Sequence, residues 1–300
     1  MTSSPRATLI GSTAILMWGT LATLTVLSGD IPPFQLLAMA FSLATLIGFL
    51  WPAGPAATRD AAEPAIAAGR WSALRLPLPV WALGIYGLFG YHFAYFMALR
   101  LAPPVEANLI NYLWPLLIVL LSGLLPGERL GARQVGGALA GFAGAALLVA
   151  RGGGLRFDGQ YAAGYAFALA CAVIWSSYSV LSRRVGAAAG ARASTRAVAG
   201  FCAATAALAL LCHWLFETTV RPVGWQWAAV VGLGLGPVGA AFYVWDYGVK
   251  RGNIQTLGVL AYGAPLLSTI LLVAVGLAEP SWTLAAACVL IVGGAAIARG

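Results

Sequence analysis

The amino-acid sequence predicts an all-α integral membrane protein in which ten transmembrane helices form two inverted repeats of five. Three observations predict this class: the composition, the length of the uncharged runs, and an internal match at a spacing of 150 residues. Of the 300 residues, 61% are hydrophobic and 9% are charged, whereas soluble chains carry about 25% charged residues. So few charges cannot cover soluble domains of this length, and a chain this apolar does not stay disordered despite its many Gly and Pro residues.

The first half contains five runs that are long enough to cross a membrane. About 20 apolar residues span the hydrocarbon core as a helix, and a helix satisfies every backbone polar group there. The runs lack the two-residue alternation of barrel strands. Arg6 precedes the first run, which is too long for a signal peptide, and Pro33 and Pro52 bound the second. We expect helices at about 7–28, 34–51, 79–100, 104–124 and 132–150.

The second half shows the same pattern of uncharged runs. Asp158 precedes a run that ends at Arg183, and charged residues separate each of the runs that follow. The connections are short except for 52–77, so the chain has no room for a soluble domain. We expect helices at about 160–182, 195–216, 223–246, 254–277 and 281–298.

The basic residues predict the orientation of these helices. Cytoplasmic loops carry the excess of Lys and Arg in membrane proteins. With the N-terminus inside, the cytoplasmic side collects 13 of the 17 basic residues and the opposite side keeps Arg100, Arg151, Arg156 and Arg221. We therefore expect both termini to be cytoplasmic.

An internal repeat relates the two halves. A shift of 150 residues aligns Tyr112 and Pro115 with Tyr262 and Pro265, and Leu-Leu follows both prolines. A glutamate follows each proline, at 128 and 279, with a glycine-rich last helix beyond it. We interpret this match as a duplication, with one five-helix unit at 1–152 and a second at 153–300.

The odd number of helices in each unit has a consequence for the architecture. The second unit must cross the membrane upside down relative to the first, as in many secondary transporters, whose substrate site lies near the midplane between the halves. Helix interruptions at corresponding positions point to that site. Pro115, Pro265 and Pro237 are therefore the expected kink or gating positions.

Several motifs resemble those of a known family. They are Trp18-Gly-Thr20 in the first helix, Tyr91-His-Phe-Ala-Tyr95 in the third and Asn111-Tyr-Leu-Trp-Pro115 in the fourth. With the two five-helix halves, the chain resembles the EamA-type members of the drug/metabolite transporter superfamily, and within it the aromatic amino-acid exporters of the YddG type. The resemblance implies export of aromatic and other hydrophobic amino acids, or similar metabolites, across a bacterial inner membrane.

Aromatic residues at mid-depth are the candidate substrate-binding residues. His92 lies near the centre of a helix that is charge-free from 76 to 99, and it shares a helix face with Tyr95. Tryptophan and tyrosine usually favour the membrane interface, so a central group suggests a cavity for an aromatic or aliphatic side chain. Aromatic core packing is the competing interpretation for each of them. The expected set is His92, Tyr95, Tyr112, Trp114, Trp175, Trp18, Tyr178 and Tyr262.

Other chemistries lack the residues they need. The net charge of +8 is not clustered as nucleic-acid binding requires, and the four cysteines show no metal-ligand spacing. Gly234-x-Gly236-x-x-Gly239 lacks the strand that a dinucleotide site requires, and Gly137-x-x-x-Gly141 more simply allows close helix approach. Glu106, Asp246 and His213 lie near helix ends, where a structural role is the simpler interpretation. We expect no catalytic residue, cofactor or metal, and no partner other than a small-molecule substrate and membrane lipid.

The function predicted is therefore secondary transport. The expected mechanism is alternating access, uncoupled or weakly coupled, because no Asp or Glu is placed at the midplane. A multidrug, nucleoside or sugar-type carrier of the same superfamily is the alternative, since fold does not fix function. An intramembrane enzyme would need a nucleophile–base pair, and a structural or channel subunit would not explain the matched prolines.

Overall fold

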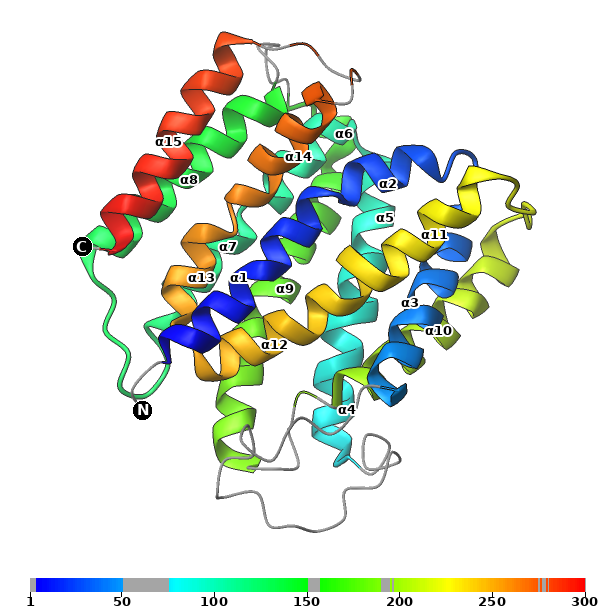
Figure 1. Cartoon of the computed structure of the whole chain (residues 1–300), viewed down its shortest axis with the longest axis horizontal. Coiled ribbons are helices and arrows are strands. Elements are labelled where there is room, and N and C mark those ends of the chain that lie inside the picture. The colour runs from blue at the N-terminus through cyan, green and yellow to red at the C-terminus, as the bar shows by residue number, and fades with distance from the viewer. Residues whose placement is uncertain are drawn as a thin grey trace.

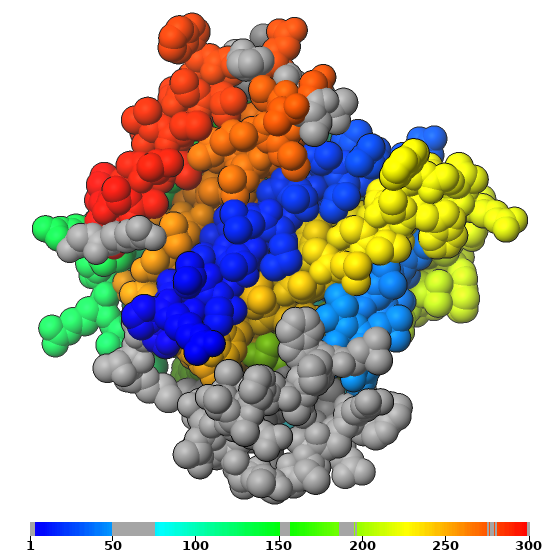
Figure 2. Space-filling view, viewed as in Figure 1, coloured from blue at the N-terminus to red at the C-terminus, as the bar shows by residue number. Residues whose placement is uncertain are grey.

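The computed structural model describes residues 4–50, 76–150, 157–189, 195, 197–274, 276, 279 and 281–299. Within these ranges every regular element is a helix. The helices pack side by side in one bundle, and segments from the two ends of the chain interleave (Figure 1). The space-filling view shows residues 5–19 lying between residues 254–274 on one side and residues 225–251 on the other (Figure 2).

The helices have the length and composition of membrane spans. The described residues include eight helices that are long and apolar enough to cross a membrane. Pro33–Phe49 and Trp282–Ala298 are shorter apolar helices. Large aliphatic side chains such as Leu9, Leu124 and Val289 are exposed on the outer surface, which suits contact with lipid. The chain is a multi-pass membrane protein.

The described residues of the first half form nine helical segments. Three of the five expected helices are interrupted, and the segments of each follow one another along one direction in Figure 1. They are α1 (Pro5–Gly19), α2 (Leu21–Leu27), α3 (Pro33–Leu50), α4 (Leu78–Ile85), the π-helical η3 (Tyr86–Gly90), α5 (Tyr91–Leu101), α6 (Pro104–Asn111), α7 (Trp114–Ser122) and α8 (Ala132–Ala150), of which α3 and α8 are continuous over an expected helix.

The second half follows the same plan. Its first helix continues to Ala189, where the sequence predicts an end at 182, and the expected helix ends at 51 and 277 lie outside the described residues. The segments are the short 3₁₀ turn η4 (Gly159–Tyr161), α9 (Ala162–Ala189), α10 (Ala197–Phe216), α11 (Trp225–Leu235), the π-helical η6 (Gly236–Ala240), α12 (Ala241–Arg251), α13 (Ile254–Leu260), α14 (Gly263–Ala274) and α15 (Trp282–Arg299).

Prolines account for most of the interruptions. A proline has no amide hydrogen, so the carbonyl four residues earlier loses its helical partner. The carbonyl that Pro115 leaves without a partner is that of Asn111, the last residue of α6. The carbonyl that Pro265 leaves without a partner is that of Ala261, the C-cap of α13. Pro237 lies in the π-helical segment η6.

The interruptions also follow the 150-residue shift. The π-helical segments begin at Tyr86 and Gly236, and the α-helices after them begin at Tyr91 and Ala241. In η3 no proline is present; instead Gly87 brings the backbone against the ring of Tyr178, where any side chain would overlap the ring.

The packing of the helices is paired across the halves. The last helices of the halves, α8 and α15, pack together, as do α3 and α10. The contact of α1 with α12 matches that of α9 with α5, and the contact of α1 with α14 matches that of α9 with α7. Glycines permit the closest of these contacts: a Cβ on Gly248 of α12 would lie 2.6 Å from the Cα of Gly11 in α1.

Polar side chains tie the helix ends together at one end of the bundle. The buried carboxylate of Glu217 accepts hydrogen bonds from the backbone amides of Phe34 and Gln35 at 3.0 Å each, which caps the start of α3. His213 Nδ1 lies 3.0 Å from the same carboxylate. Gln35 donates to the carbonyl of Val220 and accepts from its amide. These bonds join α3 to α10.

A single arginine joins three segments at the opposite end of the bundle. Arg183 of α9 pairs with Glu128 at 2.6 Å, and it donates to the carbonyls of Val249 at 3.1 Å and Gly252 at 2.6 Å. Glu128 follows a turn in which Gly127 has a φ of +80°, a conformation that favours glycine. We call Arg183, Glu128 and these two carbonyls the arginine latch.

Candidate functional site

Four tryptophans meet at the centre of the bundle, two from each half. They are Trp18 of α1, Trp114 of α7, Trp175 of α9 and Trp245 of α12, and we call them the tryptophan tetrad. All six pairs of rings are in contact, with centroids between 5.1 and 6.4 Å apart. Most of the pairs are edge-to-face, which is a favoured geometry for aromatic rings.

The helix breaks hold these rings in place. Trp114 begins α7 directly after the break before Pro115. Trp18 donates its indole hydrogen to the carbonyl of Pro237 at 3.1 Å, inside the π-helical segment η6. The two rings are therefore oriented by interruptions that lie in different halves of the chain.

A second aromatic layer lies against the tetrad. Phe242 of α12 contacts Trp175 at 5.6 Å and His92 at 6.0 Å, and it stacks on Phe41 at 5.6 Å. Tyr91 contacts both Trp175 at 5.6 Å and His92 at 5.2 Å. The layer thus places one imidazole among aromatic rings.

The bonding of His92 fixes which of its nitrogens is available. Nδ1 lies 2.7 Å from the carbonyl oxygen of Leu88, one turn earlier. A carbonyl only accepts, so Nδ1 carries the hydrogen, and Nε2 of the neutral ring is an acceptor. His92 is half-buried in the described structure and can offer this acceptor to a ligand.

Two tyrosine–asparagine bonds extend this layer between α5 and α6. Tyr95 donates to Asn108 Oδ1 at 2.7 Å, and Asn108 donates in turn to the carbonyl of Pro104. Asn111 Nδ2 donates to the hydroxyl of Tyr91 at 3.2 Å. Tyr91 and Tyr95 stack with their rings 6.1 Å apart. Hydroxyl and amide groups are therefore available beside the rings.

The structure does not bring every predicted site residue to this cluster. Trp18, Trp114 and Trp175 belong to the tetrad, Tyr178 contacts Trp175 at 5.4 Å, and Tyr112 caps α6 next to the break. Tyr262 lies in another core. Its ring packs on Phe142 at 6.4 Å and against Gly141, and its hydroxyl accepts the amide hydrogen of Leu116 at 3.1 Å.

Trp245 and Phe242 were not among the residues expected from the sequence. Trp245 is fully buried, at 1% exposure. A signal for both was present, because the 150-residue shift places Phe242 opposite His92 and Trp245 opposite Tyr95. Applying the repeat to the aromatic motif of α5 would have found them.

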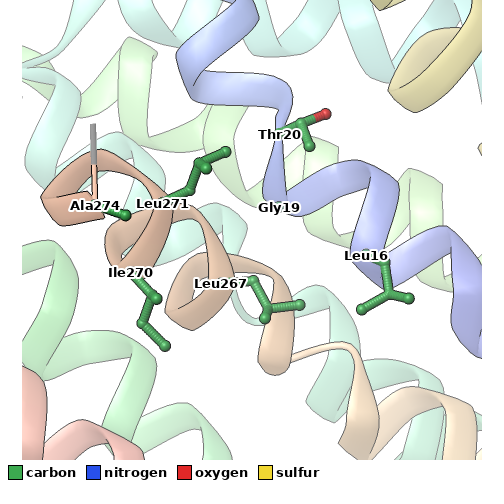
Figure 3. A pocket seen from close by; sticks show the side chains of 7 residues that line it. All are labelled: Leu16, Gly19, Thr20, Leu267, Ile270, Leu271 and Ala274. Carbon is green, nitrogen blue, oxygen red and sulfur yellow. The ribbon is translucent and has the colours of Figure 1, made fainter.

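The tetrad does not line the hollows described next. One, with a volume of about 280 Å³, lies between α1 and α14, and Figure 3 shows the aliphatic side chains and Thr20 that surround it. The other is a narrow hollow lined by residues that include Ser182, Phe201 and Lys250, at the latch end of the bundle. The tetrad rings fill the space between themselves instead of lining either hollow.

The acidic residue next to Trp245 is paired. Asp246, next to Trp245, is buried and lies 2.8 Å from Lys250 Nζ, one turn later on α12. The described residues contain no group of three or more His, Cys, Asp or Glu side chains placed to hold a metal ion. The cluster can therefore offer rings, hydroxyls, amides and an imidazole, which suits recognition of a small amphipathic solute.

Comparisons with known proteins place this chain among transporters. The sequence model of the EamA-like transporter family matches it twice, at residues 6–150 and 162–300. A protein of Ancylobacter novellus named aromatic amino acid exporter YddG is 58% identical over 297 residues, which cover 99% of this chain and 98% of the relative. The proteins of the same name from Salmonella typhimurium and Escherichia coli are each 24% identical and cover 90% and 89% of this chain. A solved crystal structure, 56% identical, has a TM-score of 0.86 and covers 98% of this chain and 97% of its own.

Proposed function

Because this chain belongs to the EamA-like transporter family and is a transporter and not an enzyme, we propose that it exports aromatic and other hydrophobic neutral amino acids, or similar small metabolites, across the bacterial inner membrane. The observation that carries the proposed substrate class is the tryptophan tetrad with its layer of tyrosine, histidine and asparagine. The name of the 58% identical relative supports the same class.

The proposed architecture is ten transmembrane helices in two inverted five-helix units, 1–152 and 153–300. The double match of the family model supports the two units. The 150-residue spacing of both π-helical segments and both proline breaks supports them as well. So do the matched contacts of α1 with α12 and of α9 with α5.

The proposed mechanism is alternating access with the tetrad as the central closure. Two of its rings come from each half, and four of its ring contacts join the two halves, so we propose that a relative movement of the halves separates these contacts. An aromatic substrate ring can take the place of one of these contacts at little cost, because it offers the same edge and face to the neighbouring indoles. In this view the arginine latch closes the cytoplasmic end of the described state, since it ties α9 to Glu128 and to the end of α12.

Transport is proposed to be downhill or only weakly coupled to an ion. A coupling site in the membrane usually relies on an ionisable residue. Asp246 is already neutralised by Lys250 on the same helix, and His92 offers an acceptor from a neutral ring.

The direct test is transport by the purified protein in liposomes. We expect uptake of radiolabelled phenylalanine, tryptophan and tyrosine, and much less uptake of glutamate or lysine. Trp175→Ala should change the ranking of these amino acids, because Trp175 contacts Trp245 within the tetrad and Tyr91 in the adjoining aromatic layer. Trp282→Ala is the matched control, since Trp282 is 91% exposed at the start of α15.

The result that would contradict the proposal is equally specific. If the liposomes take up none of the amino acids but do take up a nucleoside, a sugar or a cationic dye from the same panel, the protein is a carrier of another class in the superfamily. An imposed proton or sodium gradient that is required for amino-acid uptake would contradict weak coupling.

A further inference from the structure

One buried amide beside the aromatic layer is only half satisfied. Asn111, the last residue of α6, is 5% exposed and donates from Nδ2 to Tyr91. Its Oδ1 is buried and has no hydrogen-bond partner. Buried polar atoms are rarely left unpaired, so this oxygen indicates a place where a donor is to be supplied.

Two backbone carbonyls of the same break also lack a helical partner. Pro115 has no amide hydrogen, so it cannot close the helical turn onto the carbonyl of Asn111. The amide of Leu116 donates to the hydroxyl of Tyr262 at 3.1 Å instead of closing the next turn onto Tyr112. The break therefore presents two carbonyls that lack the amide a continuous helix would give them, together with the side-chain oxygen of Asn111.

The groups at this site carry partial negative charge, which determines the kind of ligand that it can bind. Carbonyl and amide oxygens accept hydrogen bonds and carry partial negative charge. The C-terminal end of α6 adds the negative end of its helix dipole, and unwound carbonyls at helix ends hold cations in other transporters with broken helices. A compact cation with several N–H groups is the ligand that fits.

We infer that Asn111 and the carbonyls of the α6–α7 break bind the α-ammonium group of the transported amino acid. This inference rests on the proposed function for its choice of substrate. Asn111 contacts Tyr91, and Tyr91 contacts Trp175 at 5.6 Å. An ammonium held at the break thus leaves the substrate's aromatic side chain next to the tetrad.

The repeat-related break of the second half does not reproduce this site in the described residues. The residue that the 150-residue shift places opposite Asn111 is Ala261, which has no amide. At that second break Tyr262 is completely buried and occupied by the Leu116 amide. Of the two repeat-related breaks in the described structure, at Pro115 and Pro265, the first therefore has an unpaired asparagine oxygen and the second has none at the matching position.

The test compares three ligands that differ in one group each: phenylalanine, phenethylamine, which lacks the carboxylate, and 3-phenylpropionate, which lacks the ammonium. Binding to the purified full-length protein is measured by calorimetry. The parent should bind the first two more tightly than the third. Asn111→Leu should weaken phenylalanine and phenethylamine by about tenfold or more, the size of one hydrogen bond to a charged group, and leave 3-phenylpropionate unchanged.

Two further variants serve as controls for this comparison. Asn111→Asp keeps an acceptor and adds charge, so it should retain the affinity for phenethylamine; it also carries the test if the leucine variant does not fold. Asn108→Leu is the matched control, because it removes an amide of the same helix whose two ends already have partners. Any loss that it causes should be the same for all three ligands.

The outcomes separate this inference from the proposed function. Equal weakening of 3-phenylpropionate and phenylalanine in Asn111→Leu, or no change with any ligand, would overturn the ammonium site. Tight phenethylamine binding that depends on Asn111, without any amino-acid transport in liposomes, would refute the proposed function and keep the ammonium site. If the parent bound neither amine, both would be refuted.

Discussion

At the scale of single residues, the four rings of the tryptophan tetrad form the contacts at the centre of this protein. Each edge-to-face ring pair contributes about 0.5–1.5 kcal/mol beyond the burial of its area, and four of the ring pairs in the tetrad are edge-to-face. In the proposed mechanism these contacts close the centre of the bundle, and an aromatic substrate replaces them one ring at a time.

His92 carries the residue-scale prediction. Replacing it by alanine should leave the protein folded, because the lost bond is a local one to Leu88. The variant should lose most amino-acid transport in liposomes, because the free acceptor Nε2 is gone, whereas His92→Gln, which keeps an acceptor, should retain part of it. If both variants transported like the parent, His92 would be only a core residue that satisfies a carbonyl.

The residues of the site were partly accessible from the sequence. Trp18, Trp114 and Trp175 could be chosen because they lie at mid-depth, away from the interface that tryptophan prefers. Trp245 lies beside Asp246 and near Lys250, residues typical of a helix end, so its depth does not select it and only the 150-residue shift, which places it opposite Tyr95, indicates it. Tyr262 was chosen by analogy with Tyr112, but the space left by Gly141 draws its ring into another core.

At the scale of the element, the breaks determine where functional groups lie. The prolines predicted the interruptions at Pro115, Pro265 and Pro237, since a missing amide is visible in the sequence. The π-helical segment at Tyr86–Gly90 was not predicted. It contains no proline, and its Gly87 packs against the ring of Tyr178, a tertiary contact that the sequence of one helix does not reveal. The family resemblance read from the motifs of these helices is confirmed by the family match.

Glycines in α8 and α15 give the element-scale prediction. A Cβ on Gly294 would lie 2.5 Å from the carbonyl oxygen of Gly137, and a Cβ on Gly137 would overlap the carbonyl oxygen of Gly294. Gly294→Ala should therefore separate α8 from α15 and lower the thermal unfolding temperature of the protein in detergent, measured by fluorescence-detected size exclusion.

The neighbouring glycine serves as the control for this change. A Cβ on Gly293 meets nothing within 4 Å. Gly293→Ala should be neutral or slightly stabilising, because alanine is favoured over glycine in a helix by up to about 1 kcal/mol. Equal unfolding temperatures for the two variants would show that the close contact of α8 and α15 does not hold these helices together.

At the scale of the whole molecule, the charge distribution predicts the orientation in the membrane. Phe157 and Leu130 lie beyond opposite ends of α8 and are 57% and 43% exposed. With the four native cysteines replaced, Phe157→Cys should react with an impermeant maleimide added to intact cells. Leu130→Cys should react only after the cells are permeabilised. The reverse pattern would place both termini outside.

The bond between Tyr262 and the Leu116 amide distinguishes the two halves, because its repeat-related counterpart would join Tyr112 to Leu266. In the described structure Tyr262 is completely buried and Tyr112 is only half-buried. If each half adopts the other's conformation during transport, the two hydroxyls exchange surroundings once in every cycle. The two tyrosines can then report the conformation of the protein. If one of them is replaced by fluorotyrosine, the chemical shift of its fluorine resonance would tell to which side of the membrane the central site is open.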